Sequence, residues 1–328
     1  MKELLLQRLG WIGLTALALG LLTYGLDRVG LEPVSLLEAG LLAMTPLALA
    51  AVGECVNEKA GVVNIGLEGT LLISAVAGVW VAEQFGSGVA GLIGGMTVGG
   101  LIGLVLGLLA VYGRSDQIIA GIGLNLFALG FTPYLLMSLW AFPGIHIFPR
   151  ELMVPRWITP IGQISPVTVL AVLLAILAHV LLHHTVLGFR IRAVGEKPEA
   201  VDVAGVRVDR LRLFTSVLGG ALCGLGGAFM PLAWFGGVVK EISAGRGFIA
   251  LACVVFAGLE PLLALAAAFL FGLTEGIAYA VAVTPGVKER IPFYFVNMLP
   301  YVTTLLVVAL VIGRRRFPRT IGRPYARE

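Results

Sequence analysis

Polar side chains inside apolar segments are the residues of this sequence that could do chemistry. Asn125 lies within GIGLNLFALG, Glu275 within FGLTEGIAY and Asn297 within FYFVNMLP. Such residues are costly in hydrocarbon, so they usually serve a solute or ion path, a proton relay or an interhelical hydrogen bond. For Asn125, a hydrogen bond between helices and a role in a path are both compatible with its position.

A second group of polar residues is concentrated between Gly53 and Glu68. Glycines allow the backbone to turn there, and a broken helix at membrane depth is tolerated only where it lines a cavity or is buried in protein. The interval is therefore either a pore-lining break or an ordinary loop. Its polar members are three carboxylates and two amides: Glu54, Asn57, Glu58, Asn64 and Glu68.

Motifs for nucleotide, metal or acyl chemistry are absent from the sequence. It contains no G-x-x-x-x-G-K-[ST], no H-E-x-x-H and no G-x-S-x-G. The adjacent His183 and His184 end an apolar segment, where histidines commonly cap a helix at the membrane interface. The three cysteines lack C-x-x-C spacing and are interpreted as packing residues. We expect no catalytic residue, no cofactor, no metal site and no enzymatic activity.

Composition identifies the class of protein. The chain has 328 residues, of which 58% are hydrophobic and 13% charged, and its mean hydropathy is +0.97. That leaves too little polar surface to cover a soluble globule of this size, so the chain is an integral membrane protein in contact with lipid. Its net charge of +4 comes from basic residues in a few loops, which indicates membrane orientation rather than nucleic-acid binding.

The apolar segments predict one all-α polytopic domain over residues 1–328 with about ten transmembrane helices. A crossing needs about 20 apolar residues, so the short segment Phe248–Gly258 either crosses or is re-entrant. The segment Trp140–Ser165 holds four prolines without helical periodicity and is expected to form a packed extracytoplasmic loop. The other predicted spans are Leu9–Leu26, Leu36–Val52, Gly69–Val81, Gly88–Val111, Ile118–Leu139, Pro166–Leu182, Leu213–Trp234, Leu262–Val283 and Phe293–Ile312.

The longest polar interval between apolar segments, residues 183–213, is strongly basic. Pro198 near its middle and Gly205 predict a short surface helix over Pro198–Ala204, because proline favours the first helical turn and glycine follows the last. With ten crossings and a cytoplasmic N-terminus, 16 of the 23 Lys and Arg residues fall on the cytoplasmic side. The positive-inside rule therefore places both termini, this interval and the basic tail 314–328 in the cytoplasm.

Four blocks of the sequence resemble a known family. They are GECVNEKAGVVNIGLEGTLLISAVAG (53–78), QIIAGIGLNLFALG (117–130), GFRIRAVGEKPEAVDVAGV (188–206) and GRGFIALACVVFAGLEPLLALAAAFLFG (245–272). Between Leu36 and Gly313 the chain resembles inner-membrane permease subunits of bacterial ABC importers. The subgroup is that of the simple-sugar and nucleoside permeases, related to the ribose and branched-chain amino acid permeases.

This resemblance implies a transport subunit that pairs with a second, paralogous permease, an ABC ATPase and an extracytoplasmic substrate-binding protein. It also implies that the basic interval carries a helix that docks on the ATPase. Glu199, Ala200 and Gly205 match the E-A-A-x-x-x-G spacing of that segment, whereas Val201 replaces its second alanine. The residues predicted to couple the permease to the ATPase are Arg190, Arg192, Glu196, Pro198, Glu199, Ala200, Ala204 and Gly205.

A translocation path should bind its solute weakly, so amides and aromatic rings suit its lining. We predict Asn64, Glu68, Asn125, Trp234 and Phe248 for this role, although Trp234 fits interfacial anchoring equally well. The cargo would be a purine or pyrimidine nucleoside or a related simple sugar. The alternative is a secondary transporter driven by an ion gradient, with Glu54, Glu68 or Glu275 as carriers of the ion or proton.

Overall fold

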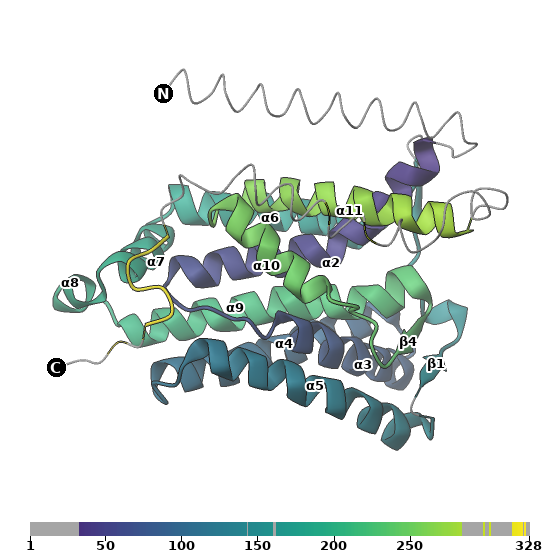
Figure 1. Cartoon of the computed structure of the whole chain (residues 1–328), viewed down its shortest axis with the longest axis horizontal. Helices are drawn as coiled ribbons and strands as arrows, with labels where there is room; N and C mark the ends of the chain where they lie inside the picture. The colour runs from purple at the N-terminus through teal and green to yellow at the C-terminus, as the bar shows by residue number, and fades with distance from the viewer. Residues whose placement is uncertain are drawn as a thin grey trace.

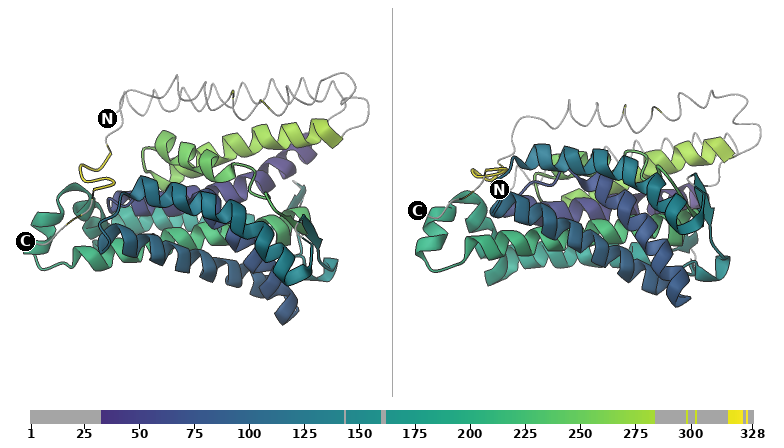
Figure 2. Two further views of the ribbon diagram at one scale, coloured as in Figure 1. Left: turned by 60° about the horizontal axis from the view of Figure 1, so that its bottom comes forward. Right: turned by 90° about the horizontal axis from the view of Figure 1, so that it is seen from below.

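The computed structural model describes residues 33–142, 144–159, 162–283, 298, 302, 317–323 and 325. Its helices form an elongated bundle whose two ends differ (Figure 1). Two short helices, α7 (Val186–Glu196) and α8 (Pro198–Val203), project from one end, which we call the α7–α8 end. Short β-strands lie at the opposite end, which we call the strand end, and Figure 2 shows the same separation from two further directions.

Six of the described helices are long and apolar enough to cross a membrane. The predicted spans Leu9–Leu26 and Phe293–Ile312 and the residue Asn297 lie outside the described residues, so the total of ten crossings stays a prediction. The six helices are α2 (Pro33–Lys59), α4 (Gly88–Val111), α5 (Gln117–Trp140), α6 (Pro166–His184), α9 (Val208–Phe229) and α11 (Pro261–Val283).

Two further helices lie inside the bundle. α3 (Leu67–Phe85) follows α2 after the segment 60–66, which returns into the bundle without helical structure (Figure 1). α10 (Arg246–Ala257) has 12 residues and crosses obliquely between the longer helices. At about 1.5 Å per residue, α10 is too short to span the hydrocarbon core alone. The sequence left open whether Phe248–Gly258 crosses or is re-entrant, and the helix that contains most of it is as short as the pattern predicted.

Helix α2 continues further than the sequence pattern predicted. It includes Gly53 to Lys59, because its polar side chains are satisfied inside the protein rather than by water. Glu54 is fully buried and its carboxylate accepts hydrogen bonds from Asn57 Nδ2 at 3.2 Å and the Asn64 backbone N–H at 2.6 Å. The break is therefore confined to residues 60–66 and lies against buried protein, which excludes the ordinary solvated loop as an interpretation of this interval.

Glycines bring α4 and α9 into close contact. A Cβ atom at Gly224 would lie 2.7 Å from the Gly99 Cα atom, and one at Gly99 would lie 2.5 Å from the Gly224 Cα atom. Side chains at these two positions would force the helices apart. The glycine-rich character of both segments thus reflects direct backbone packing, as expected for helices in a membrane.

The segment after α5 is ordered at the strand end. β1 (Ile145–Ile147) pairs antiparallel with β4 (Gly237–Val239), with His146 opposite Val238. A short 3-10 helix, η1 (Arg150–Leu152), precedes β2 (Trp157–Thr159), which pairs antiparallel with β3 (Gly162–Ile164). Phe148 and Val154 are buried, so the packed loop predicted for this region is confirmed as a packed structure.

Side chains of α3 and α5 hold this segment in place. His146 Nε2 lies 2.6 Å from Glu83 Oε1, and Trp140 Nε1 donates to Glu83 Oε2 at 2.7 Å. The Trp140 and His146 rings stack with centroids 4.2 Å apart. One carboxylate on α3 therefore fixes both the end of α5 and the strand that follows it.

Candidate functional site

Glu68 joins two helix N-termini in the interior of the bundle. It lies in the first turn of α3, and its Oε1 atom accepts hydrogen bonds from Ser243 Oγ at 2.5 Å and from the Gly245 backbone N–H at 2.7 Å. Its Oε2 atom accepts from the Gly247 backbone N–H at 2.7 Å. Gly245 is the N-cap residue of α10, so one carboxylate faces the positive ends of the α3 and α10 dipoles.

Two predicted path residues, Asn64 and Asn125, also bind backbone. Asn125 Oδ1 accepts from the Gly69 backbone N–H at 2.8 Å, while its Nδ2 donates to the Ile65 carbonyl at 3.0 Å. Asn64 Oδ1 accepts from the Gly66 backbone N–H at 2.8 Å. Like Glu68, both asparagines are buried. These three side chains therefore hold the break between α2 and α3 in shape, and their role along a path stays a prediction.

Glu275, singled out in the sequence, forms an ion pair with Arg246 beside two aromatic rings. The Arg246 guanidinium carbon lies 4.8 Å from the centroid of the Trp234 ring and 5.5 Å from that of Phe235. Both rings belong to η2 (Met230–Phe235), a π-helical turn that continues α9, and they stack with centroids 4.3 Å apart. Pairing with a carboxylate and contact with ring faces offset the cost of burying this cation.

Next to this group the strand end is hollowed by a cavity of about 750 Å³. Its wall is mostly apolar, with Phe148, Met153 and Phe235 among the lining residues and Arg246 and Glu241 supplying charge. The Nε atom of Arg246 is buried and makes no hydrogen bond within the described part of the chain. An apolar wall with a few polar groups is the usual composition of a site for a small organic solute.

The sequence pattern did not predict the residues that line this cavity, and it identified only two residues close to them in the chain. It singled out Trp234, which stacks on the cavity-lining Phe235, and Phe248, whose side chain is exposed on the first turn of α10. Arg246 is the first residue of α10 and is not among the site residues that the sequence pattern predicted. The signal available in the sequence was a basic residue two positions before the short apolar segment Phe248–Gly258.

At the α7–α8 end, helix α8 presents an apolar tip. Val203 is 91% exposed, and the predicted coupling residues Ala200, Ala204 and Gly205 are exposed beside it. Val201, which departs from the expected alanine, is buried against Val194 and Val208. The substitution thus faces the inside of the structure and leaves the apolar tip formed by Ala200, Val203 and Ala204 unchanged.

The remaining predicted coupling residues are divided between surface and interior. Arg190 and Glu196 on α7 and Glu199 on α8 are exposed, whereas Arg192 is half-buried. Pro198 is buried and begins α8, as the sequence pattern predicted. A short helix is present at the predicted position, although it ends at Val203 rather than Ala204 and follows a separate helix, α7; its role in coupling stays a prediction. Thr185 begins α7 because its Oγ1 accepts from the Gly188 backbone N–H at 3.0 Å.

A C-terminal segment, residues 317–323, packs against α7 (Figure 1). Arg212 holds it: the guanidinium donates to the Ala60 carbonyl at 3.2 Å and to the Arg323 carbonyl at 3.0 Å. Thr320 Oγ1 donates to the Gly195 carbonyl at 2.7 Å, and the Gly322 backbone N–H donates to the Gly61 carbonyl at 3.0 Å. The segment therefore connects α7 with the break between α2 and α3.

We expect Arg212→Gln to release this segment. The side chain of Arg212 is almost completely buried, so its loss leaves two carbonyl groups without their donor, at a cost of about 2–4 kcal/mol. Limited trypsin digestion should then cleave after Arg319 faster than in the unmodified chain. Arg210→Gln is the matched control, because Arg210 is exposed on the same helix. Equal cleavage rates in the two variants would contradict the clamp.

The family model described as "Branched-chain amino acid transport system / permease component" matches residues 36–312. The chain belongs to this family. The match includes the break at 60–66, the α7–α8 end and α10, so each of these features lies within the family's shared region. The protein is accordingly a multi-pass membrane permease rather than an enzyme.

Similar proteins include three named ABC transporter permeases. The nucleoside ABC transporter permease protein NupC of Lactococcus lactis is 35% identical over 88% of this chain and 95% of its own length. The guanosine ABC transporter permease protein NupQ of Bacillus subtilis is 33% identical over the same shares. The nucleoside ABC transporter permease protein NupB of Lactococcus lactis is 27% identical over 72% of this chain and 70% of its own length.

Proposed function

We propose that this permease is the translocation subunit of an ATP-driven ABC importer for nucleosides. The observation that carries the proposal is the likeness to NupC and NupQ over nearly the whole of each protein. The cavity at the strand end supports it, because aromatic rings and a buried guanidinium suit a solute with a flat base and a polar sugar.

The orientation of the permease follows from its charges and from α8. We place the α7–α8 end and both termini in the cytoplasm, since residues 183–213 and 314–328 contain most of the arginines. There the exposed tip of α8 would dock on an ABC ATPase, with Arg190, Glu196 and Glu199 providing charged contacts around an apolar centre. Small residues at the tip would allow close approach to a cleft in the partner.

The strand end would then face the extracytoplasmic side and receive solute from a substrate-binding protein. A second permease would complete the path, and a paralogue is favoured because Lactococcus lactis has two nucleoside permeases, NupC and NupB, that both resemble this chain. Phe248 and Val255 of α10 are exposed and offer a surface toward that subunit. Movement of α8 by the ATPase would rock the helices between outward-open and inward-open packings.

A reconstitution experiment tests this function. The permease is expressed with its genomic neighbours, purified, and placed in proteoliposomes with ATP inside and binding protein outside. We expect co-purification of an ATPase and a second permease, and ATP hydrolysis that rises when the binding protein carries a purine or pyrimidine nucleoside. Stimulation by a free pentose or hexose instead would reassign the cargo to sugars.

The same vesicles distinguish an ion-gradient mechanism. In the structure Glu54 and Glu68 accept backbone hydrogen bonds and Glu275 pairs with Arg246, so an ion or proton carrier would have to break these contacts. Uptake through an ATP-driven path should continue when ionophores remove the proton and sodium gradients. Uptake that needs a gradient but no ATPase would overturn the proposal.

A further inference from the structure

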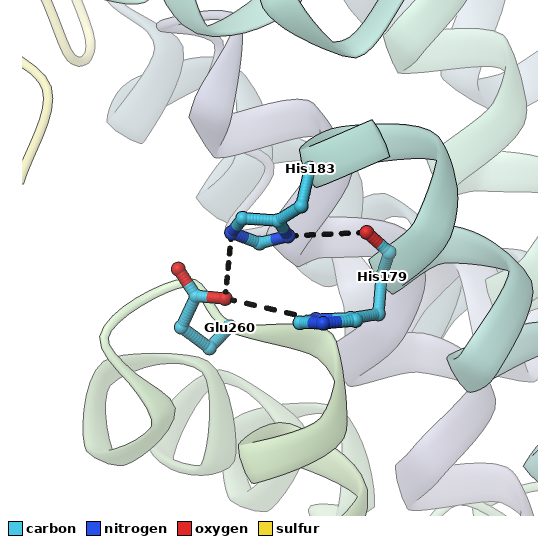
Figure 3. Close-up of side chains that lie close together, drawn as sticks. All are labelled: His179, His183 and Glu260. Carbon is cyan, nitrogen blue, oxygen red and sulfur yellow. Dashed lines mark hydrogen bonds and ion pairs between the residues drawn. The ribbon is translucent and has the colours of Figure 1, made fainter. Parts of the chain in front are cut away.

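Three titratable side chains meet at the α7–α8 end, away from the cavity and from the tip of α8. His179 and His183 are four residues apart on α6, so their rings share one face of the helix. Glu260 lies directly before α11, in the turn after α10, and its carboxylate points toward both rings (Figure 3). We call these three residues the His–His–Glu cluster.

The distances within the cluster suit a metal ion. Glu260 Oε2 lies 3.2 Å from His183 Nε2 and 4.0 Å from His179 Nδ1, and the three atoms all lie within 4.8 Å of one another. In a tetrahedral site with bonds of about 2.0–2.2 Å, ligand atoms are about 3.3–3.6 Å apart. Small side-chain rotations would bring the three atoms to that spacing. Two histidines and a glutamate form a known zinc ligand set that leaves one position for solvent.

Hydrogen bonding places a lone pair on His183 toward the carboxylate. His183 Nδ1 lies 3.1 Å from the His179 carbonyl oxygen, and because a carbonyl only accepts, this nitrogen carries a proton. In the neutral ring Nε2 is then an acceptor facing the Glu260 carboxylate, an arrangement that needs a cation between them. A histidine fixed through its second nitrogen by a carbonyl is also the usual arrangement around a bound metal.

The surroundings of His179 indicate whether the cation between His183 and Glu260 is a proton or a metal ion. Its Nδ1 atom is buried and makes no hydrogen bond within the described residues. A proton on His183 would satisfy the contact with Glu260 but would leave His179 Nδ1 without a partner. A metal ion satisfies all three ligand atoms at once. The side chains are 26–31% exposed, so an ion could enter from solvent.

Among the described residues, Lys59 is a further charged group in contact with the cluster. Its Nζ lies 3.0 Å from Glu260 Oε1, which leaves Oε2 for the histidines. This contact orients the carboxylate, while its positive charge opposes a divalent ion electrostatically. His184 is exposed on the same helix, and its ring centroid lies 6.2 Å from that of His179.

We propose that His179, His183 and Glu260 bind a divalent transition-metal ion of the zinc class. The ion would join the end of α6 to the start of α11, close to Lys59 at the end of α2. Because α6 leads through Thr185 directly into α7, the bound ion would resist displacement of α7 and α8 relative to α11. The metal would thus act on the part of the permease that moves during coupling.

Metal titration of the full chain tests the site. The protein is purified without a polyhistidine tag, treated with a chelator and titrated with Co²⁺, whose visible absorption reports tetrahedral nitrogen and oxygen ligands; Zn²⁺ is then added in competition. We expect one ion per chain, displaced by Zn²⁺. His179→Gln, His183→Gln and Glu260→Gln should each weaken binding about tenfold or more. Zn²⁺ should raise the Tm of the unmodified chain and leave the Tm of these variants unchanged.

Two further variants separate a metal site from a simple ion-pair cluster. His184→Gln should bind as tightly as the unmodified chain, because His184 is a neighbouring histidine outside the cluster. Lys59→Gln should bind several-fold more tightly, since it removes the opposing charge. Absence of saturable binding by the monodisperse unmodified chain, or equal losses in His184→Gln and the three cluster variants, would overturn the proposal.

Discussion

Replacing Glu68 with alanine should abolish transport and destabilise the interior of the permease. The carboxylate accepts hydrogen bonds from Ser243 Oγ and from the backbone N–H groups of Gly245 and Gly247. Its removal leaves these buried donors unsatisfied and takes negative charge away from two helix N-termini. We expect a loss of about 3–5 kcal/mol in unfolding free energy and at least a tenfold fall in uptake. Thermal unfolding and reconstituted uptake measure the two effects.

Two variants test the cause of the Glu68 effect. Glu68→Gln keeps one acceptor oxygen and the side-chain volume, so it should lose less stability than Glu68→Ala. Glu241→Gln is the control for the unfolding measurement alone, because Glu241 also lines the cavity at the strand end. It is an exposed carboxylate near the same end of α10 and accepts no such backbone hydrogen bonds among the described residues. If Glu68→Ala unfolded at the same temperature as this control, the carboxylate would not hold the α10 N-terminus.

Replacing Val203 with glutamate should uncouple the permease from its ATPase without unfolding it. The Val203 side chain is 91% exposed at the tip of α8, so its replacement disturbs little within the chain itself. In the proposed interface a carboxylate would have to be buried without a partner, which costs several kcal/mol. We expect nucleoside-stimulated ATP hydrolysis to fall at least tenfold, with reduced co-purification of the ATPase and an unchanged Tm.

A valid control for Val203→Glu must be equally exposed but remote. Ile158→Glu meets this need, because Ile158 is also 91% exposed and belongs to β2 at the strand end. It should retain its ATPase. Gly205→Arg should also abolish transport while the protein stays inserted, although Gly205 has φ of +83° and the replacement adds backbone strain of about 1–2 kcal/mol. Normal stimulation in Val203→Glu would remove the tip of α8 from the proposed coupling surface.

The individual helices were largely predictable from local pattern. Gly88–Val111 begins and ends as predicted, because it is uniformly apolar and Ser87 caps its first turn. The short helix at Pro198 was also predictable, since proline and glycine act within their own turns. Local pattern was misleading for Glu54 and Glu58, which suggested a possible loop. Both are buried within α2, and Glu54 accepts hydrogen bonds from Asn57 and Asn64 inside the protein.

The candidate site was harder to predict because its residues act over long separations. The sequence pattern identified Glu68 and Asn125 as unusual, but it could not show that both bind backbone groups of other segments. It assigned His183 to interfacial capping without considering His179 or Glu260. Arg212 was counted only as one of several loop cations, whereas it is buried and holds the C-terminal segment.

The sequence by itself determined that this protein lies in a membrane. It also determined the residue ranges of most helices and the position of the basic interval, because hydrophobicity and charge are properties of individual residues. The tertiary structure decided which polar groups meet. Glu68 reaches α10 across 179 positions of the chain, as the Gly247 contact shows, and His183 meets Glu260 only because α6 and the start of α11 pack at the same end. A buried carboxylate binds whichever donors the fold brings within reach, and that choice depends on packing rather than on its neighbours in sequence.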